Sequence, residues 1–269
     1  MVTFPDPRVT KELLVADMIA HAEADELVRG TYGEDHPAFR GCAVGCSIHT
    51  INRVTGRAIP YGDHAALADA TGISFALIHL QDRVFEGLPV ELSDDWPRRF
   101  YAAVPKNVDL SPAVDRVLVR ILRKIALPCV TVDEWGVRAV IEMVVTAIKT
   151  GVGLRAAANA SVDAAYAAYA AASDAADAAD AAGDAADAAD AAYAAAAYTA
   201  SYAAKAAFYA AKAAADSTTN AADASYAAYA ASYAADATAD AADDDSAAYT
   251  RMGEIICEEM AACTSAVDA

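Results

Sequence analysis

The stretch YTASYAAKAAFYAAKAAAD, residues 198–216, decides the fold class of this chain. Six of its side chains follow one another at intervals of 4, 3, 4, 3 and 4 residues: Tyr198, Tyr202, Lys205, Tyr209, Lys212 and Asp216. A mean interval of about 3.5 residues is the repeat of α-helices in coiled-coil register. Alanine, which fills most of the other positions, has the highest helix propensity. The stretch therefore predicts a helix that carries one stripe of tyrosine and charged side chains.

The same spacing recurs on both sides of this stretch. Intervals of 3 and 4 residues separate an earlier set, Asp177, Asp180, Asp184 and Asp187, and a later set, Tyr226, Tyr229, Tyr233, Asp236, Asp240 and Asp243. Breaks in this spacing, and runs of residues that favour caps and turns, predict helices at 154–190, 192–216, 220–243 and 246–263. Gly183 lies inside the first of these helices and costs it about 1 kcal/mol relative to alanine, so a break or a close helix contact can occur there.

The alanine content predicts how these helices pack. Each alanine buries little area, so the usual stabilisation of about 25 cal/mol per Å² is small for each residue. Alanine does let helix backbones approach closely and gain dispersion contacts along a seam. All 14 acidic residues between 151 and 250 are Asp, whose short side chain fits beside such a seam better than Glu would. We expect closely packed antiparallel helices, as hairpins or a bundle; the alternative is a single extended or frayed helix.

The first part of the chain has a different composition. Residues 1–150 are an ordinary mixture, whereas about half of residues 151–250 are alanine, which predicts a boundary near residue 150 and domains at 1–150 and 151–269. Capping residues, Gly and Pro divide the first part into predicted helices: Thr10 to Val28, 41–51, after Asp63, 73–88, after Asp95, from Ser111, and up to Gly151. No run alternates polar and apolar residues as a strand would, so the predicted fold class is all-α.

Charge limits the classes of partner. The formal charge is −18, and residues 151–250 carry 3 Lys/Arg against 14 Asp, hence −11. Such a field repels nucleic acid and anionic membranes and attracts basic protein surfaces. No signal peptide or membrane-spanning run is evident, and five cysteines in that context favour reduced thiols. We expect a soluble cytoplasmic protein that does not bind nucleic acid directly.

One cluster has the residue types of a metal site. Cys42, Cys46 and His49 share a face if residues 41–51 are helical, and His64 or His36 could complete a tetrahedral zinc site. The alternative is that the cysteines and the histidine are ordinary buried core residues.

Catalytic signals are weak. His79 and Asp82, and Asp82 and Glu86, are spaced to meet on one predicted helix, but such pairs are far more often salt-bridged helix surface than catalytic groups. The common hydrolase, zinc-protease, phosphate-loop and dinucleotide-binding motifs are absent from the sequence. We therefore assign no catalytic residues.

The tyrosine stripe allows two interpretations. The rings of Tyr198, Tyr202, Tyr209, Tyr226, Tyr229 and Tyr233 can fill the space that alanine leaves empty while their hydroxyls reach water. Alternatively, these tyrosines and Asp177, Asp180, Asp184 and Asp187 form a binding surface, since tyrosine is enriched at interfaces.

Three motifs and the tail resemble a known group of proteins. HAEADELVRG (21–30), GCAVGCSIHT (41–50), LQDRVFEGLP (80–89) and the alanine-rich tail are similar to a group of uncharacterised bacteriophage and prophage proteins. Tails in that group use Ser, Trp and Glu between the alanines, whereas this one uses Asp and Tyr. The resemblance implies a phage context and a helical fold, and no activity.

Two function classes follow. The favoured hypothesis is a non-enzymatic helical interaction protein whose acidic helices bind a basic host protein, such as a defence protein, or assemble into a homo-oligomer. The alternative is a metal- or small-molecule-binding protein, including a nucleotide binder, or a metal-dependent enzyme centred on Cys42, Cys46 and His49.

Overall fold

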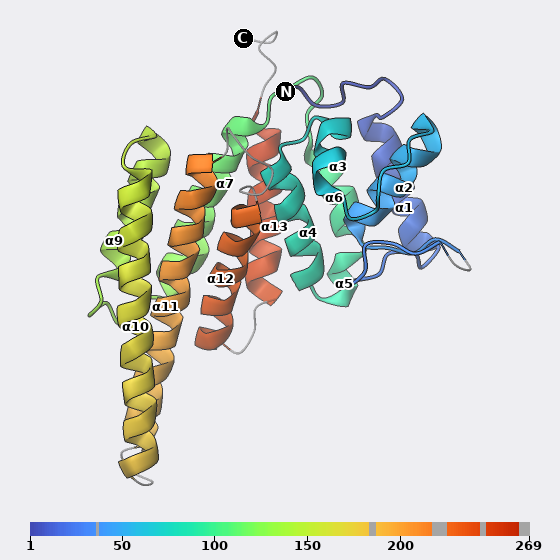
Figure 1. Ribbon diagram of the computed structural model, residues 1–269. Coiled ribbons are helices and arrows are strands. Elements are labelled where there is room, and N and C mark those ends of the chain that lie inside the picture. The colour runs from blue at the N-terminus through green and yellow to red at the C-terminus, as the bar shows by residue number, and fades with distance from the viewer. Residues whose placement is uncertain (36–37, 183–186, 217–224, 243–245, 264–269) are drawn as a thin grey trace. The chain divides into compact units, whose positions relative to one another are not determined.

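The computed structural model describes residues 1–35, 38–182, 187–216, 225–242 and 246–263. These residues form helices joined by turns and loops, with three isolated β-bridges and no sheet (Figure 1). The all-α prediction is confirmed. No helix in the described ranges has both the length and the apolar character needed to cross a membrane.

Contacts divide the chain into two compact units. Unit 1 comprises Met1–Val117 and Tyr249–Ala269, and unit 2 comprises Leu118–Ala248. The change in composition lies elsewhere, near residue 150, and helix α9 (Val137–Thr150), of ordinary composition, packs with alanine-rich helices of unit 2.

The helices of unit 1 are short. They are α1 (Lys11–Glu23), α2 (Ala43–Thr55), α3 (His64–Thr71), α4 (Phe75–Gly87), α5 (Val90–Ser93) and α6 (Trp96–Ala103), with α7 (Ser111–Ile121) and α13 (Ser246–Ala261) each crossing a unit boundary. Two predicted caps are confirmed, because the Thr10 side chain accepts a hydrogen bond from the Leu13 N–H and the Asp63 carboxylate accepts one from the Ala66 N–H.

One predicted helix end in unit 1 is wrong, and Asp95 occupies the predicted N-cap position of α6 without a capping hydrogen bond. Helix α1 ends at Glu23 instead of Val28, because Asp25 adopts φ of 60°, in the left-handed region that stops an α-helix. The Asp95 side chain makes no capping hydrogen bond to α6 and instead accepts one from Arg98 Nε at 2.8 Å. An ion pair with a nearby guanidinium competes here with the helix cap.

Large aromatic side chains fill the core of unit 1. Trp96, Tyr101, Tyr249, Phe85 and Phe100 are among its largest fully buried side chains. Two of them have polar atoms with partners inside the core: Trp96 Nε1 donates to the Gln81 carbonyl at 2.9 Å, and Tyr101 Oη donates to a serine hydroxyl on α2 at 2.7 Å. The core therefore binds α4 and α6 together, and α2 to α6, by specific contacts.

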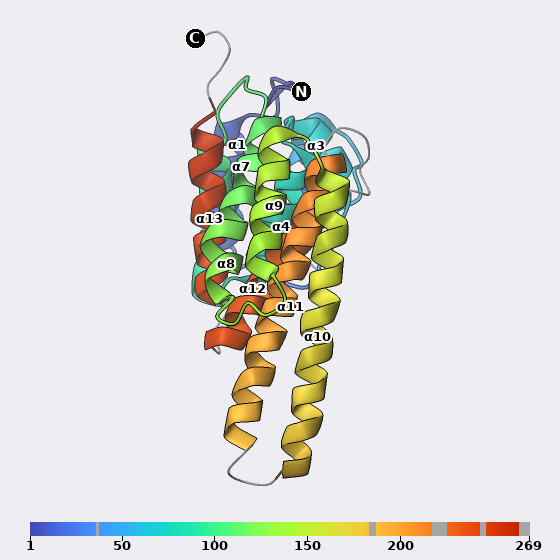
Figure 2. The same ribbon diagram turned by 90° about the vertical axis from the view of Figure 1, so that its left-hand side faces the viewer.

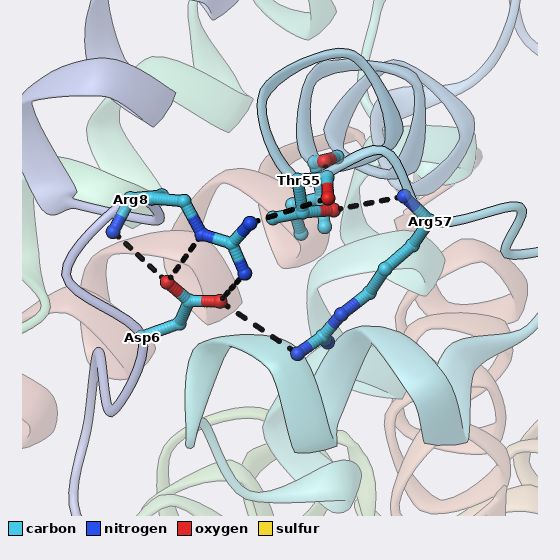
Figure 3. A network of polar contacts seen from close by, with 5 residues as sticks. Asp6, Arg8, Thr55 and Arg57 are labelled. Atoms are coloured by element: carbon cyan, nitrogen blue, oxygen red, sulfur yellow. Dashed lines mark hydrogen bonds and ion pairs between the residues drawn. The ribbon is translucent and has the colours of Figure 1, made fainter.

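An ion-pair network attaches the N-terminal segment to the end of α2 (Figure 3). The Asp6 carboxylate accepts hydrogen bonds from the Arg8 side chain, and Arg57 lies 3.7 Å from the same carboxylate. Arg8 Nη1 also donates to the Thr55 carbonyl at 3.2 Å. A cation at the last turn of a helix interacts favourably with the helix dipole. The hydrogen bond from Arg8 holds the pKa of Asp6 at about 2.

Long antiparallel helices form unit 2. They are α10 (Leu154–Ala182), α11 (Asp187–Asp216) and α12 (Ser225–Ala242), accompanied by α9, the π-helical turn η1 (Leu122–Ala126) and α8 (Leu127–Cys129). Helices α10 and α11 run side by side in opposite directions in both views (Figure 1, Figure 2), and α12 packs on α11. The predicted close antiparallel packing is confirmed.

The predicted boundary between the first two of these helices is wrong. It was placed at 190–192, but those residues lie inside α11, and α10 already ends at Ala182. Gly183 is the only glycine between 154 and 252 and lies outside the described residues. The spacing of the non-alanine side chains changes at 190–192, but the helix continues there because alanine has a high helix propensity.

Most of the buried residues of α11 and α12 are alanines. Fourteen alanines on the described parts of these helices are fully buried: Ala197, Ala200, Ala203, Ala204, Ala206, Ala207, Ala210 and Ala211 on α11, and Ala227, Ala230, Ala231, Ala234, Ala235 and Ala237 on α12. Side chains of this size keep neighbouring backbones close, so dispersion along the seam replaces the interlocking of larger side chains.

Candidate functional site

The tyrosine stripe forms a cluster with two lysines in unit 2. We define the tyrosine–lysine cluster by ten side chains on α10, α11 and α12: Tyr169, Tyr198, Tyr202, Lys205, Phe208, Tyr209, Lys212, Tyr226, Tyr229 and Tyr233.

Lys205 lies among three rings. Its Nζ is 5.6 Å from the Tyr169 ring centroid, 4.9 Å from that of Tyr202 and 5.6 Å from that of Tyr233. Lys212 Nζ lies 4.6 Å from the Tyr226 ring centroid. Ring faces carry negative potential, so each contact is a cation–π interaction of about 0.5–1 kcal/mol at an exposed site.

Tyr209 connects the rings of α11 and α12. Its ring centroid lies 5.8 Å from that of Tyr226, 5.2 Å from that of Tyr229 and 5.2 Å from that of Tyr233. The Tyr209 and Tyr233 rings are close to parallel, with an interplanar angle of 6°. Burial and the neighbouring Tyr209 raise the pKa of Tyr233, so the Tyr233 phenol is neutral at physiological pH.

A cavity of about 440 Å³ lies beside the cluster. It is lined by Val162, Ala165, Tyr166, Tyr169, Lys205, Phe208, Tyr209 and Tyr233. The exposed fractions of Tyr166, Tyr169 and Tyr229 are 72%, 51% and 50%, so these rings face solvent. The walls of the cavity are therefore aromatic and aliphatic, with one ammonium group.

The structure brings together most of the predicted binding tyrosines. Five of the six are linked through Tyr209 and Lys212 or Lys205, and the sixth, Tyr198, contacts Tyr169 across α10 and α11 at 5.8 Å between ring centroids. Tyr166 and Tyr169 were not among the predicted residues, although their spacing of three residues in SVDAAYAAYA matches that of the later stripes.

The predicted aspartates are placed only in part. Asp177 and Asp180 belong to α10 and Asp187 begins α11, but their side chains, and Asp184 altogether, are outside what the structure describes. The assignment of these four residues to a binding surface stays a prediction.

A second cluster, in unit 1, consists of Cys42, Asp82 and Glu86. One ligand atom from each side chain lies within 4.8 Å of the others, and no other described group of three His, Cys, Asp or Glu side chains is this compact. Cys42 immediately precedes α2, while Asp82 and Glu86 are one turn apart on α4. A cavity of about 200 Å³ adjoins these carboxylates and is lined by Gly30, Thr31, Tyr32, Asp82 and Glu86.

Two glycines allow the loop before α2 to reach this cluster. A Cβ at Gly45 would lie 1.5 Å from the carbonyl oxygen of Tyr32, and one at Gly41 would lie 2.6 Å from the same atom. The Tyr32 backbone therefore lies directly against α2. In the same loop, the Gly30 N–H donates a hydrogen bond to Glu86 at 2.9 Å. The glycines of the GCAVGC motif are thus required by a close backbone approach.

His64 fixes the orientation of Asp82. Its Nε2 lies 2.9 Å from Asp82 Oδ2 and its Nδ1 lies 2.9 Å from the Gly62 carbonyl oxygen. The Gly62 carbonyl oxygen can only accept, so Nδ1 carries a proton, and an ionised Asp82 carboxylate favours a second proton on Nε2. Burial acts to lower the pKa of His64, but the hydrogen bond and the charge of Asp82 outweigh burial and raise it. Asp82 Oδ1, in contrast, is buried without a hydrogen-bond partner.

The pKa values of three neighbouring groups, His79, Cys42 and Glu86, are shifted at this site. His79 stacks on His64 with 4.3 Å between ring centroids, and burial together with the charge of His64 lowers the pKa of His79 to about 4. Burial, assisted by the charge of Asp82, raises the pKa of the Cys42 thiol to about 12. Burial also raises the pKa of Glu86.

The structure separates most of the predicted zinc ligands. Cys46 donates to the Gly41 carbonyl at 3.4 Å, and His49 stacks on the Phe39 ring with 4.1 Å between centroids. Only Cys42 belongs both to the predicted set and to the compact cluster, which His64 reaches through Asp82. His36, the other predicted fourth ligand, lies outside the described residues. The sequence predicts that Asp82 and Glu86 meet on one helix face, as a salt-bridged surface more often than as catalytic groups, and gives no signal that Cys42 lies beside them.

Comparison of the chain with protein families, with curated proteins and with solved structures finds no match.

Proposed function

We propose that the protein is a non-enzymatic binding protein whose helices α10–α12 bind a basic surface of another protein. The observation that carries this proposal is the partly exposed tyrosine–lysine cluster beside a cavity of about 440 Å³. Tyrosine supplies large contact area at a low cost in conformational entropy, and it is enriched among the residues that dominate binding energies.

Charge favours a basic partner. Residues 151–250 carry a net charge of −11, and the described aspartates Asp163 and Asp174 of α10 are exposed. Lys205 and Lys212, the two lysines of the cluster, are already in contact with ring faces of the chain itself. Exposed rings such as Tyr166 can accept cationic side chains of a partner, and the surrounding acidic field steers such a partner to the surface.

The resemblance to bacteriophage and prophage proteins supports a more specific form of the proposal. In that form the partner is a host protein of the cytoplasm, such as a defence protein, whose basic surface otherwise binds nucleic acid. Carboxylates on α10–α12 then occupy the positions of phosphates in that complex.

Synthetic peptides test the proposal directly. Three labelled peptides of equal length, rich in Lys/Arg, in Asp/Glu and in Gly/Ser, are titrated with the whole protein while fluorescence anisotropy is recorded at low and at physiological salt. We expect binding of the basic peptide alone, with an affinity that falls as salt rises. Binding of the acidic peptide, or of no peptide, would overturn the proposal.

Matched variants assign the binding to the cluster. The double variant Tyr166→Ser with Tyr229→Ser is expected to weaken binding of the basic peptide at least tenfold, since it removes two exposed rings. Tyr32→Ser removes an equally exposed ring of unit 1 and is expected to leave binding unchanged. Light scattering of the protein alone shows whether the chain self-associates. If it does, and if the basic peptide dissociates the oligomer, the partner is a second copy of the chain.

A further inference from the structure

We propose that Cys42, Asp82 and Glu86 bind a divalent transition-metal ion of the zinc class, with one coordination position open to the adjoining cavity. This site lies in unit 1 and is independent of the binding proposed for α10–α12. It also differs from the Cys42, Cys46, His49 and His64 set that the sequence predicts.

The donor atoms suit such an ion. A tetrahedral zinc ion with a sulfur ligand at about 2.3 Å and oxygen ligands at about 2.1 Å holds its ligand atoms about 3.5 Å apart. The three atoms here lie within 4.8 Å of one another, so metal binding requires them to move closer together by about 1 Å. A thiolate is a soft ligand that favours zinc, cobalt or cadmium over magnesium or calcium.

One buried polar atom lacks a hydrogen-bond partner at this site, and a buried thiol lies close to it. The Asp82 side chain is 14% exposed, and its Oδ1 is buried with no hydrogen-bond partner among the described residues. Cys42 is only 1% exposed, and its sulfur accepts hydrogen bonds from the backbone N–H groups of Val44 and Gly45. A buried carboxylate oxygen without a partner is unfavourable, and a cation bound between it and the Cys42 sulfur would satisfy that oxygen.

Neighbouring groups hold both carboxylates in position. His64 donates to Asp82 Oδ2 at 2.9 Å and leaves Oδ1 available, while the Gly30 N–H donates to Glu86 Oε2 at 2.9 Å. Such outer contacts orient metal ligands and are required for full affinity.

The adjoining cavity leaves room for a fourth ligand. It measures about 200 Å³, enough for several waters or a small anion, and Asp82 and Glu86 form part of its wall. Three protein ligands with an open position are typical of zinc sites that bind a water or substrate, whereas structural sites have four protein ligands. Binding forms a metal–sulfur bond, and the thiol proton of Cys42 is released to solvent.

Cobalt(II) alone is the probe for this site. The whole protein, freed of metal with a chelator, is titrated with cobalt(II) while its absorption spectrum is recorded. We expect one equivalent to produce a thiolate-to-cobalt charge-transfer band in the ultraviolet and visible bands of four- or five-coordinate cobalt, and zinc to displace both. A spectrum without a charge-transfer band would overturn the proposal.

Matched variants identify the ligands. Cys42→Ser is expected to abolish the charge-transfer band, whereas Cys46→Ser, which changes another fully buried thiol of the same region, is expected to retain it. Asp82→Asn and Glu86→Gln are expected to weaken cobalt binding at least tenfold, and His64→Gln by about 10- to 100-fold through loss of orientation. Loss of the band in Cys46→Ser with retention in Cys42→Ser would overturn the assignment. Far-UV circular dichroism establishes that each variant retains its helices.

Discussion

Replacement of a buried alanine by leucine tests whether α10–α12 are held by close backbone packing. Ala204 of α11 is fully buried, and further fully buried alanines precede and follow it on the same helix. Ala204→Leu adds three carbon atoms, whose burial in an existing space would stabilise the protein by about 2 kcal/mol. In a closely packed seam they instead force the helices apart, at a cost of about 1–3 kcal/mol. We expect a cost near 3 kcal/mol, because separation of two helices also weakens the neighbouring alanine contacts.

Urea denaturation followed by circular dichroism measures this change in the free energy of unfolding. Ala195→Leu is the matched control, since Ala195 is an exposed residue of the same helix, and its effect should stay within about 0.5 kcal/mol. Ala204→Ser separates volume from polarity. A serine hydroxyl within a helix can donate to the carbonyl four residues earlier, as Ser161 does to Ala157 at 2.8 Å, so this variant should be the milder one. An unchanged or increased stability of Ala204→Leu would refute the close-packing argument.

Three further predictions concern other contacts. Gly45→Ala should destabilise the protein by more than about 1 kcal/mol in thermal unfolding, because the new Cβ would overlap the Tyr32 carbonyl oxygen. An unchanged melting temperature would contradict the close contact between Gly45 and the Tyr32 backbone. Lys205→Met keeps the aliphatic stem but removes the ammonium group, and should cost about 1 kcal/mol in urea denaturation. No loss there would show that the three rings do not stabilise the cation. Asp6→Asn should reduce stability above about pH 4 and have no effect below about pH 2, because the pKa of Asp6 is about 2 in the folded protein and about 3.8 for an ordinary aspartate. A difference from wild type that persists at low pH would mean that the carboxylate charge is not responsible.

Local patterns account for most of the helices. Stripe spacing, alanine propensity and the caps Thr10 and Asp63 all act within a few residues of the chain, so they can be read without knowledge of the tertiary structure. Errors occurred where a single residue ended a helix. Asp25 does so through its left-handed backbone conformation, which several residue types can adopt and which no pattern marks.

The candidate sites were harder to predict, because each joins distant segments. The tyrosine spacing on α11 and α12 was sufficient to place those rings on one face, but the contact of Lys205 with Tyr169 depends on how α10 packs. The Cys42 cluster depends on the approach of α2 to α4. Cys42 and Asp82 are forty residues apart in the chain. Residue spacing predicts only which side chains share a face of one helix, so it grouped Cys42 with Cys46 and could not group it with Asp82.

The alanine seam leaves the axial register of α11 and α12 weakly specified by the seam itself. A slip of one helix along the other by one turn, about 5.4 Å, would exchange alanine contacts for nearly identical ones. It would separate Tyr202 from Tyr233 and Tyr209 from Tyr229, rings that now lie 6.1 Å and 5.2 Å apart between centroids. The tyrosines therefore set the sliding position of two otherwise uniform helices, and a partner that engages these rings also acts on the register.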